Sequence, residues 1–176
     1  MIKIYNTDIE DVKLISPNVY NDERGYFFES FNSSKFNLGK DKILFSQDNE
    51  SLSKFCTLRG IHFQKKPYQQ SKLVRVIKGK IQDIAVDLRL GSPTYKKYVS
   101  VILDDKDKKQ IFIPKGFGHA FLVLSETAIV SYKVDNYYDP DFDSGIRFDD
   151  PTLNISWELN TEDIIISNKD KNLPYL

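Results

Sequence analysis

A histidine close to two cationic side chains is the feature of this sequence with the most chemical content. His62 lies in the segment 58–64, near Arg59 and Lys72, and it is one of only two histidines in the chain. An imidazole takes up and releases a proton near neutral pH. Cations beside it can bind an anion or stabilise a developing negative charge. The sequence therefore predicts proton transfer on a negatively charged small molecule.

A histidine satisfied inside the core is the alternative interpretation, and for a histidine alone it is the better one. The nearby Arg59, Gln64 and Lys72 favour a site, because a core would not recruit so many polar groups. In a regular strand Gly60, His62 and Gln64 share one face, and Arg59 lies on the other. If Arg59 and His62 face one pocket, the strand must bend, and Gly60 is a suitable place for a β-bulge.

Two further side chains lie on predicted strands. Lys72 shares a strand face with Val74, and an inward lysine would be costly without an anionic partner. Tyr132 alternates with apolar residues in 128–134, and its phenol is a plausible proton donor. The chain has ten tyrosines, so the pattern does not single this one out.

His119 follows a turn bracketed by Gly116 and Gly118, and a structural role is again the alternative. Two distant histidines cannot make a three-histidine zinc site, and no spacing supports a mixed histidine and carboxylate site. No phosphate-binding glycine loop or dinucleotide fingerprint is present, so we expect neither metal nor cofactor. Asp150 and Asp170 are each a possible cap, turn residue or partner for His62.

Composition excludes several classes of function. Lys plus Arg equals Asp plus Glu at 25 each, which gives no electrostatic case for binding nucleic acid or an acidic membrane. The single Cys56 rules out an internal disulfide and is most simply a buried core residue. No signal peptide is visible, and the apolar runs are far too short for a membrane span. We expect a cytoplasmic protein.

Short strands dominate the predicted structure. Aromatic and β-branched residues are abundant, apolar positions repeat with period two, and Gly, Pro and Asp punctuate the runs. This pattern predicts an all-β jelly-roll sandwich or barrel, with helical turns at 33–36 and 161–163 and one domain over 1–176. The expected strands are 73–77, 81–88, 110–114, 120–124 and 128–134.

These motifs together resemble the dTDP-4-dehydrorhamnose 3,5-epimerases of the cupin superfamily. The resemblance covers nearly the whole chain in order. The matching segments are DERGYFFE (22–29), QDNES (47–51), LRGIHFQ (58–64), VDLR (86–89), SPT (92–94), QIFIP (110–114), GFGHAF (116–121), YK (132–133), GIR (145–147), DDP (149–151) and SNKD (167–170).

The resemblance implies a cupin-type jelly-roll homodimer without metal, acting on a dTDP-4-keto-6-deoxyhexose. It assigns His62 as the base, Asp170 as its partner, Lys72 beside the keto oxygen and Tyr132 as the acid on the opposite face. It also implies that some N-terminal contacts come from the partner subunit. The positions expected to contact nucleotide, diphosphate or sugar are Arg24, Glu29, Gln47, Asn49, Arg59, His119, Tyr138, Asp143 and Lys169.

The sequence departs from the family pattern at a few positions. Asp143 stands where Glu is usual, which shortens its reach by one methylene. Gly118 and Ala120 are exchanged relative to the common order, and both are small. The alternatives are an epimerase that inverts a single carbon of a related nucleotide-4-ketosugar, a non-catalytic sugar-nucleotide-binding cupin and a metal-dependent cupin isomerase or dioxygenase.

Overall fold

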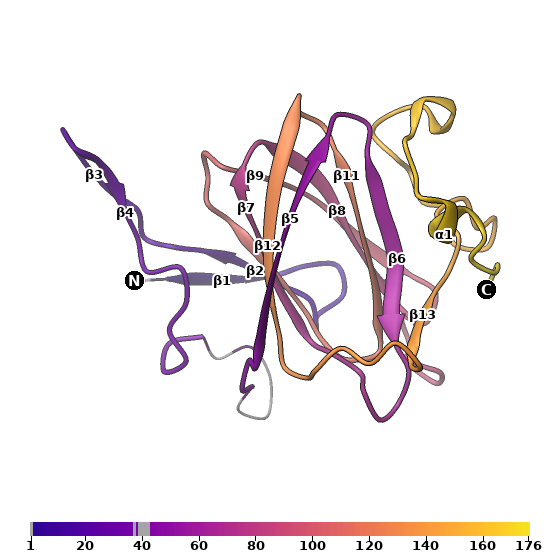
Figure 1. Ribbon diagram of the computed structural model, residues 1–176. Coiled ribbons are helices and arrows are strands. Elements are labelled where there is room, and N and C mark those ends of the chain that lie inside the picture. Colours follow the sequence, from indigo (N-terminus) through magenta and orange to yellow (C-terminus); the bar gives the residue numbers. More distant parts are fainter. Residues whose placement is uncertain (1, 37, 39–42) are drawn as a thin grey trace.

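Two facing antiparallel sheets form the body of the protein. The computed structural model describes residues 2–36, 38 and 43–176, and Figure 1 shows the sheets on either side of a common core. The larger sheet has the strand order β1-β2-β10-β7-β12-β5. Its strands are β1 (Lys3–Asn6), β2 (Lys13–Ser16), β10 (Gln110–Ile113), β7 (Lys72–Lys78), β12 (Thr127–Val134) and β5 (Gln47–Lys54).

The second sheet has the order β13-β6-β11-β8-β9. Its strands are β13 (Asp143–Gly145), β6 (Leu58–Gln64), β11 (Phe117–Val123), β8 (Lys80–Asp87) and β9 (Tyr98–Asp104). A separate hairpin, β3 (Tyr20–Asp22) with β4 (Gly25–Phe27), projects from the body in Figure 1. The helices are η1 (Thr161–Asp163) and α1 (Asn168–Lys171). No helix in the described part of the chain is long and apolar enough to cross a membrane.

The predicted jelly-roll architecture is confirmed, and one boundary is wrong. Residues 115–118 were expected to form a turn, but β11 already begins at Phe117 and includes Gly118. Gly116, at φ +85°, makes the reversal, so the ladder with β8 starts directly after it. Gly118 pairs with Val86, and a methyl group there would come within 2.6 Å of Ile61.

The core has three layers because each sheet is covered on both faces. Alternate residues of β8 show this directly. Ile81 and Ala85 belong to the cluster between the sheets, whereas Ile84 and Val86 pack outward against the C-terminal segment around Trp157. Segments before β5 cover the outer face of the larger sheet. β11 is buried at every residue because it lies in the middle of its sheet and both faces of that sheet are covered.

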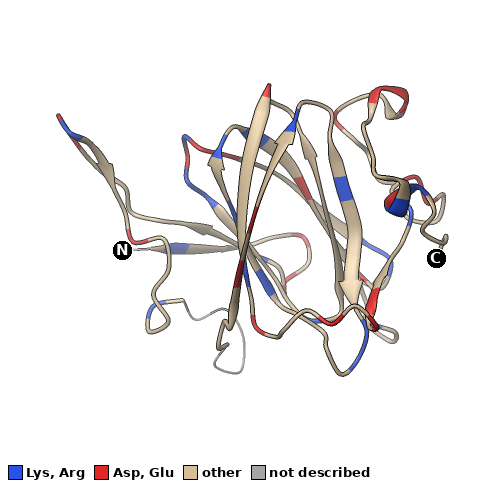
Figure 2. Ribbon diagram, in the orientation of Figure 1, with Lys and Arg blue, Asp and Glu red and all other residues tan. Residues whose placement is uncertain are grey.

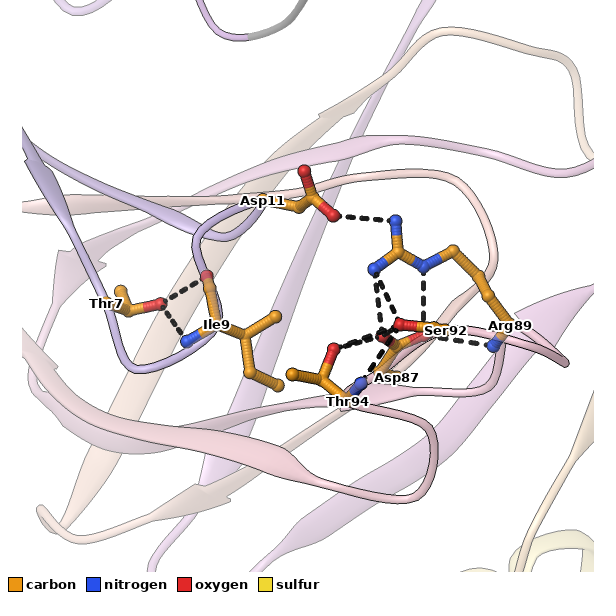
Figure 3. A network of polar contacts seen from close by, with 7 residues as sticks. All are labelled: Thr7, Ile9, Asp11, Asp87, Arg89, Ser92 and Thr94. Atoms are coloured by element: carbon orange, nitrogen blue, oxygen red, sulfur yellow. Dashed lines mark hydrogen bonds and ion pairs between the residues drawn. The ribbon is translucent and has the colours of Figure 1, made fainter.

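A buried ion pair fastens the N-terminal loop to the loop after β8. Asp87 is fully buried and accepts hydrogen bonds from Arg89 Nε and Nη2 and from the hydroxyls of Ser92 and Thr94. Arg89 Nη1 reaches Asp11 at 2.8 Å, as Figure 3 shows. Burial alone would raise the pKa of Asp87, but these hydrogen bonds together outweigh it and hold the pKa well below its ordinary value.

We expect Asp87→Asn to lower the free energy of unfolding by about 2–4 kcal/mol, because it leaves buried donors without a charged acceptor. The contribution is complete above the unfolded pKa of 3.8 and is lost as pH falls through the lowered folded pKa. Urea denaturation at pH 7 measures it. Asp149→Asn is the matched control, since Asp149 makes the same two-bond contact with Arg147 at the surface; we expect less than about 1 kcal/mol there. Equal losses would contradict the assignment.

Candidate active site

A cavity of about 480 Å³ is lined by residues of both sheets and of the C-terminal segment. A smaller one of about 130 Å³ shares His62, Lys72 and Tyr132 with it. Charged residues gather mainly at strand ends, in loops and along the C-terminal segment, as Figure 2 shows. The charged groups that line the cavities between the sheets are therefore exceptional and need partners.

His62 is paired with a buried carboxylate. Its Nε2 lies 2.8 Å from Asp170 Oδ1, and the Gly60 N–H donates to Asp170 Oδ2 at 3.3 Å. Ser167 caps α1 by accepting from the Asp170 N–H, which fixes the carboxylate's position. Burial opposes ionisation, but the hydrogen bonds from His62 and Gly60 outweigh it and lower the pKa of Asp170. The ionised Asp170 therefore accepts a hydrogen bond from the Nε2–H group of His62, which leaves Nδ1 of His62 without a proton and able to accept one.

Of the two carboxylates considered as partners for His62, the structure selects Asp170. Asp150 is elsewhere: it accepts from the backbone N–H groups of Thr152, Leu153 and Leu176.

The expected β-bulge at Gly60 is present. His119 pairs with His62 and Phe121 with Arg59, so the register between β6 and β11 shifts at this point. Gly60 has φ +121°, a conformation that other residues rarely adopt. The extra residue turns Arg59 and His62 toward the same cavity, whose lining includes both.

Lys72 and Tyr132 come from the opposite sheet. Lys72 lies on the same inward face of β7 as Val74. Tyr132 packs against the core cluster between the two sheets. Burial lowers the pKa of Lys72 to about 8, against the opposing charges of Asp83 and Asp143. Burial also raises the pKa of Tyr132, so its phenol remains protonated near neutral pH. One wall thus holds an imidazole paired with a carboxylate, and the other holds an amino group and a protonated phenol.

The smaller cavity is lined by four of the nine residues expected to contact nucleotide, diphosphate or sugar, which are Gln47, Asn49, Tyr138 and Asp143. Asn49 lies opposite Tyr132 in the β5–β12 ladder, and Gln47 Nε2 donates to its side chain at 2.9 Å. At the rim, Asp143 accepts from Tyr138 Oη at 3.2 Å and from Lys169 Nζ. Even with its shorter side chain, Asp143 lines this cavity.

Gln64 has a structural role. Its side chain donates to the carbonyl oxygens of Tyr68 and Tyr137 and accepts from the Asp139 N–H. It thereby ties together two loops at the rim.

His119 is 6% exposed and lines the main cavity, with Nε2 2.9 Å from Asp83 Oδ2. Sequence reasoning missed Asp83. The signal was available, because Asp83 occupies an inward position between the apolar Ile81 and Ala85.

Arg24 and Glu29 are not brought to the cavity by this chain. Arg24 lies at the tip of the projecting hairpin, where its side chain is 85% exposed and pairs, among the residues that the structure describes, with Asp22. Glu29 pairs with Lys35 and Asn32 beside a different hollow. Among the residues that the structure describes, no group of three or more His, Cys, Asp and Glu side chains is arranged to hold a metal ion.

Fold and cavity define a jelly-roll protein with a paired histidine on one sheet facing a lysine and a tyrosine on the other. The family model described as dTDP-4-dehydrorhamnose 3,5-epimerase matches residues 6–176. The chain belongs to this family.

Individual relatives of the chain carry the same family name or that of a 3,5-epimerase. The dTDP-4-dehydrorhamnose 3,5-epimerase of Methanothermobacter thermautotrophicus is 49% identical over 97% of this chain and 92% of its own. The crystal structure of the Legionella pneumophila dTDP-6-deoxy-D-glucose-3,5-epimerase with dTDP-4-keto-L-rhamnose is 44% identical, with TM-score 0.95 over 99% of this chain and 93% of that one. The Bacillus anthracis enzyme, solved with TDP and PPi, is 42% identical and has TM-score 0.95 over 100% of both chains.

Gly60→Ala should damage both the bulge and the site. A methyl group there would come within 2.5 Å of the His119 carbonyl oxygen and 2.6 Å of Ala120 Cβ, in addition to the unfavourable φ. We expect a loss of about 2–4 kcal/mol in the free energy of unfolding. Gly25→Ala is the control, because φ is +125° there but no atom lies within 4 Å of the added group; it should lose about 1 kcal/mol. Similar losses in urea denaturation would show that backbone conformation alone explains the effect.

Proposed function

We propose that this protein epimerises C3 and C5 of dTDP-4-dehydro-6-deoxy-D-glucose to give dTDP-4-dehydro-L-rhamnose. The observation that carries the proposal is the placement of a base and an acid on opposite walls of one cavity. His62 belongs to β6 of the five-stranded sheet and Tyr132 to β12 of the six-stranded sheet. A proton removed by one and returned by the other inverts a carbon held between them.

The chemistry requires an acidic C–H bond and a stabilised enolate. A hydrogen next to the C4 ketone is acidic because its removal delocalises charge onto the keto oxygen. His62, oriented by Asp170 at 2.8 Å, would remove this proton. Lys72, protonated below its pKa of about 8, would stabilise the enolate oxygen in a partly desolvated pocket. Tyr132 would then return a proton from the other face.

Both carbons next to the ketone can react in the same pocket, which would account for a double inversion. The carbons lose and regain protons without a change in oxidation state, so the reaction needs no redox cofactor. Gln47, Asn49, Tyr138, Asp143 and Lys169 adjoin the same space and supply polar groups for the nucleotide and sugar. In the main cavity, Arg59 and His119 supply groups for the diphosphate or sugar.

Proton exchange tests the function directly. We expect proton NMR of dTDP-4-keto-6-deoxyglucose incubated with the protein in heavy water to show deuterium replacing the hydrogens at both C3 and C5, with chelator present. His62→Ala should slow this exchange at least about 100-fold, because the base is removed.

Lys109→Ala is the control, since Lys109 pairs with Asp107 in a loop and does not line the cavity; its exchange rate should be that of the wild type. Exchange at only one carbon would indicate a single-carbon epimerase. Its absence at both, despite nucleotide binding, would contradict the proposed reaction.

We further propose a homodimer in which the β3–β4 hairpin completes the site of the partner subunit. The hairpin exposes Tyr20 by 60%, Tyr26 by 57% and Phe27 by 71%. Within this chain, Lys108 donates to the Tyr26 hydroxyl at 3.1 Å and lies over its ring, but Tyr20, Tyr26 and Phe27 each remain more than half exposed. Apolar surface of this kind on a projecting element favours an interface with a second chain. Arg24 and Glu29 would reach the partner's bound nucleotide from there.

Mixing two inactive variants tests this arrangement. Arg24→Ala and His62→Ala should each be impaired alone. After dissociation and random reassociation, half of the dimers combine one subunit of each kind, and one of their two sites then has both native residues. We expect about a quarter of wild-type activity to return.

The control mixes Lys72→Met with His62→Ala. Both residues line the cavity of the same chain, so no native site can form. If heterodimers form but activity does not rise in the first mixture, Arg24 does not serve the partner's site.

A further inference from the structure

Asp83 is a buried carboxylate that the reaction outlined above does not use. It lies on β8, fully buried, with Ile81 and Ala85 on the same face. Phe121 is its partner across the β8–β11 ladder. Its Oδ2 contacts His119, and Oδ1 has no hydrogen-bond partner among the described residues. A half-satisfied carboxylate in apolar surroundings is destabilising, so its presence calls for a role other than packing.

Asp83 does not line the cavity itself but contacts His119, which does. His119, with which it pairs, is the cross-strand neighbour of His62. Its charge also acts on Lys72, where it opposes the effect of burial. The titratable and charged groups that line the two cavities together with Lys72 come from both sheets and the C-terminal segment: Glu50, Arg59, His62, His119, Tyr132, Tyr138, Asp143, Lys169 and Asp170. The carboxylates whose charges raise the pKa of Lys72 are Asp83 and Asp143. Asp83 is fully buried, and Asp143 is already engaged by Lys169.

The hydrogen bond between Asp83 and His119 fixes the tautomer of the His119 ring. An ionised carboxylate can only accept a hydrogen bond, so His119 Nε2 must carry the proton. Burial lowers the pKa of His119, which keeps the ring neutral near pH 7. Its Nδ1 is then left as a hydrogen-bond acceptor, suited to a sugar hydroxyl.

We propose that Asp83 is a positioning residue of this site, which holds His119 protonated on Nε2 and supplies the negative charge that keeps Lys72 cationic. The inference rests on the proposed function, because it assigns Asp83 to the support of the cation beside the enolate. Asp83 itself does not touch the reacting carbons.

The tautomer is tested in the wild-type protein without substrate. The chain has only two histidines, so nitrogen-15 NMR resolves two imidazole rings, and His62→Ala assigns them. We expect His119 with a proton on Nε2 and none on Nδ1 at pH 7. A protonated Nδ1 with bare Nε2 would overturn the inference, whether or not any substrate is turned over.

Asp83→Asn tests the effect on Lys72. We expect the lysine to titrate near pH 8 in the wild type and about one pH unit lower in the variant, followed by carbon-13 NMR of ε-labelled lysine and assigned with Lys72→Met. The basic limb of kcat/KM should move with it, and kcat should fall about fivefold at pH 8, because the protonated fraction of Lys72 falls by that factor, with little change in KM.

Asp150→Asn is the matched control, because Asp150 is also a buried carboxylate but caps a turn outside the cavity. Its Lys72 titration and pH profile should match those of the wild type. If Asp83→Asn lowers the melting temperature while the Lys72 titration stays in place, Asp83 is structural and the inference fails. A shifted Lys72 titration without turnover of the ketosugar would support the inference and refute the proposed reaction.

Discussion

Charge placed between two apolar sheets is the constraint on which this structure depends. A lone ion there would be strongly destabilising, so each buried charge at the cavity has an opposite charge or several hydrogen bonds nearby. Asp170 meets His62, and Asp83 meets His119. Lys72 has the charges of Asp83 and Asp143 to offset its burial. The same arrangement that makes these groups tolerable also sets their protonation states, so stability and reactivity share one set of contacts.

The two-sheet design places the side chains of the cavity on two opposed walls. β6, β8 and β11 place His62, Asp83 and His119 on one side, and β7 and β12 place Lys72 and Tyr132 on the other. Sheets that are covered on both faces, as here, hold their separation through close packing. The distance between acid and base is therefore a property of the whole core rather than of a loop.

The strands and the bulge could be predicted because their signals are local. Period-two alternation indicated β7, β8 and β12. A regular strand would place Arg59 and His62 on opposite faces, so a pocket shared by both indicated a bend at Gly60. The choice of Asp170 over Asp150 could not be made from the residues alone, because 108 positions separate it from His62 and only the fold brings them together. Strand periodicity placed Asp83 at an inward position, but its partner His119 lies 36 positions away and only the fold brings the two side chains together. The family resemblance, unlike periodicity, indicated His62, Lys72, Tyr132 and Asp170 as a set.

The short helix α1 affects which part of the protein unfolds first. The carboxylate that orients His62 belongs to a helix of only four residues, joined to β6 across a long stretch of sequence. Small peripheral elements of this kind open by local fluctuation at a lower free energy than the sheets they cover. Detachment of α1 would separate Asp170 from His62 while both sheets remain paired. Under mild destabilisation, the proposed base would then lose the carboxylate that orients it in a state that spectroscopy of the β-structure still reports as folded.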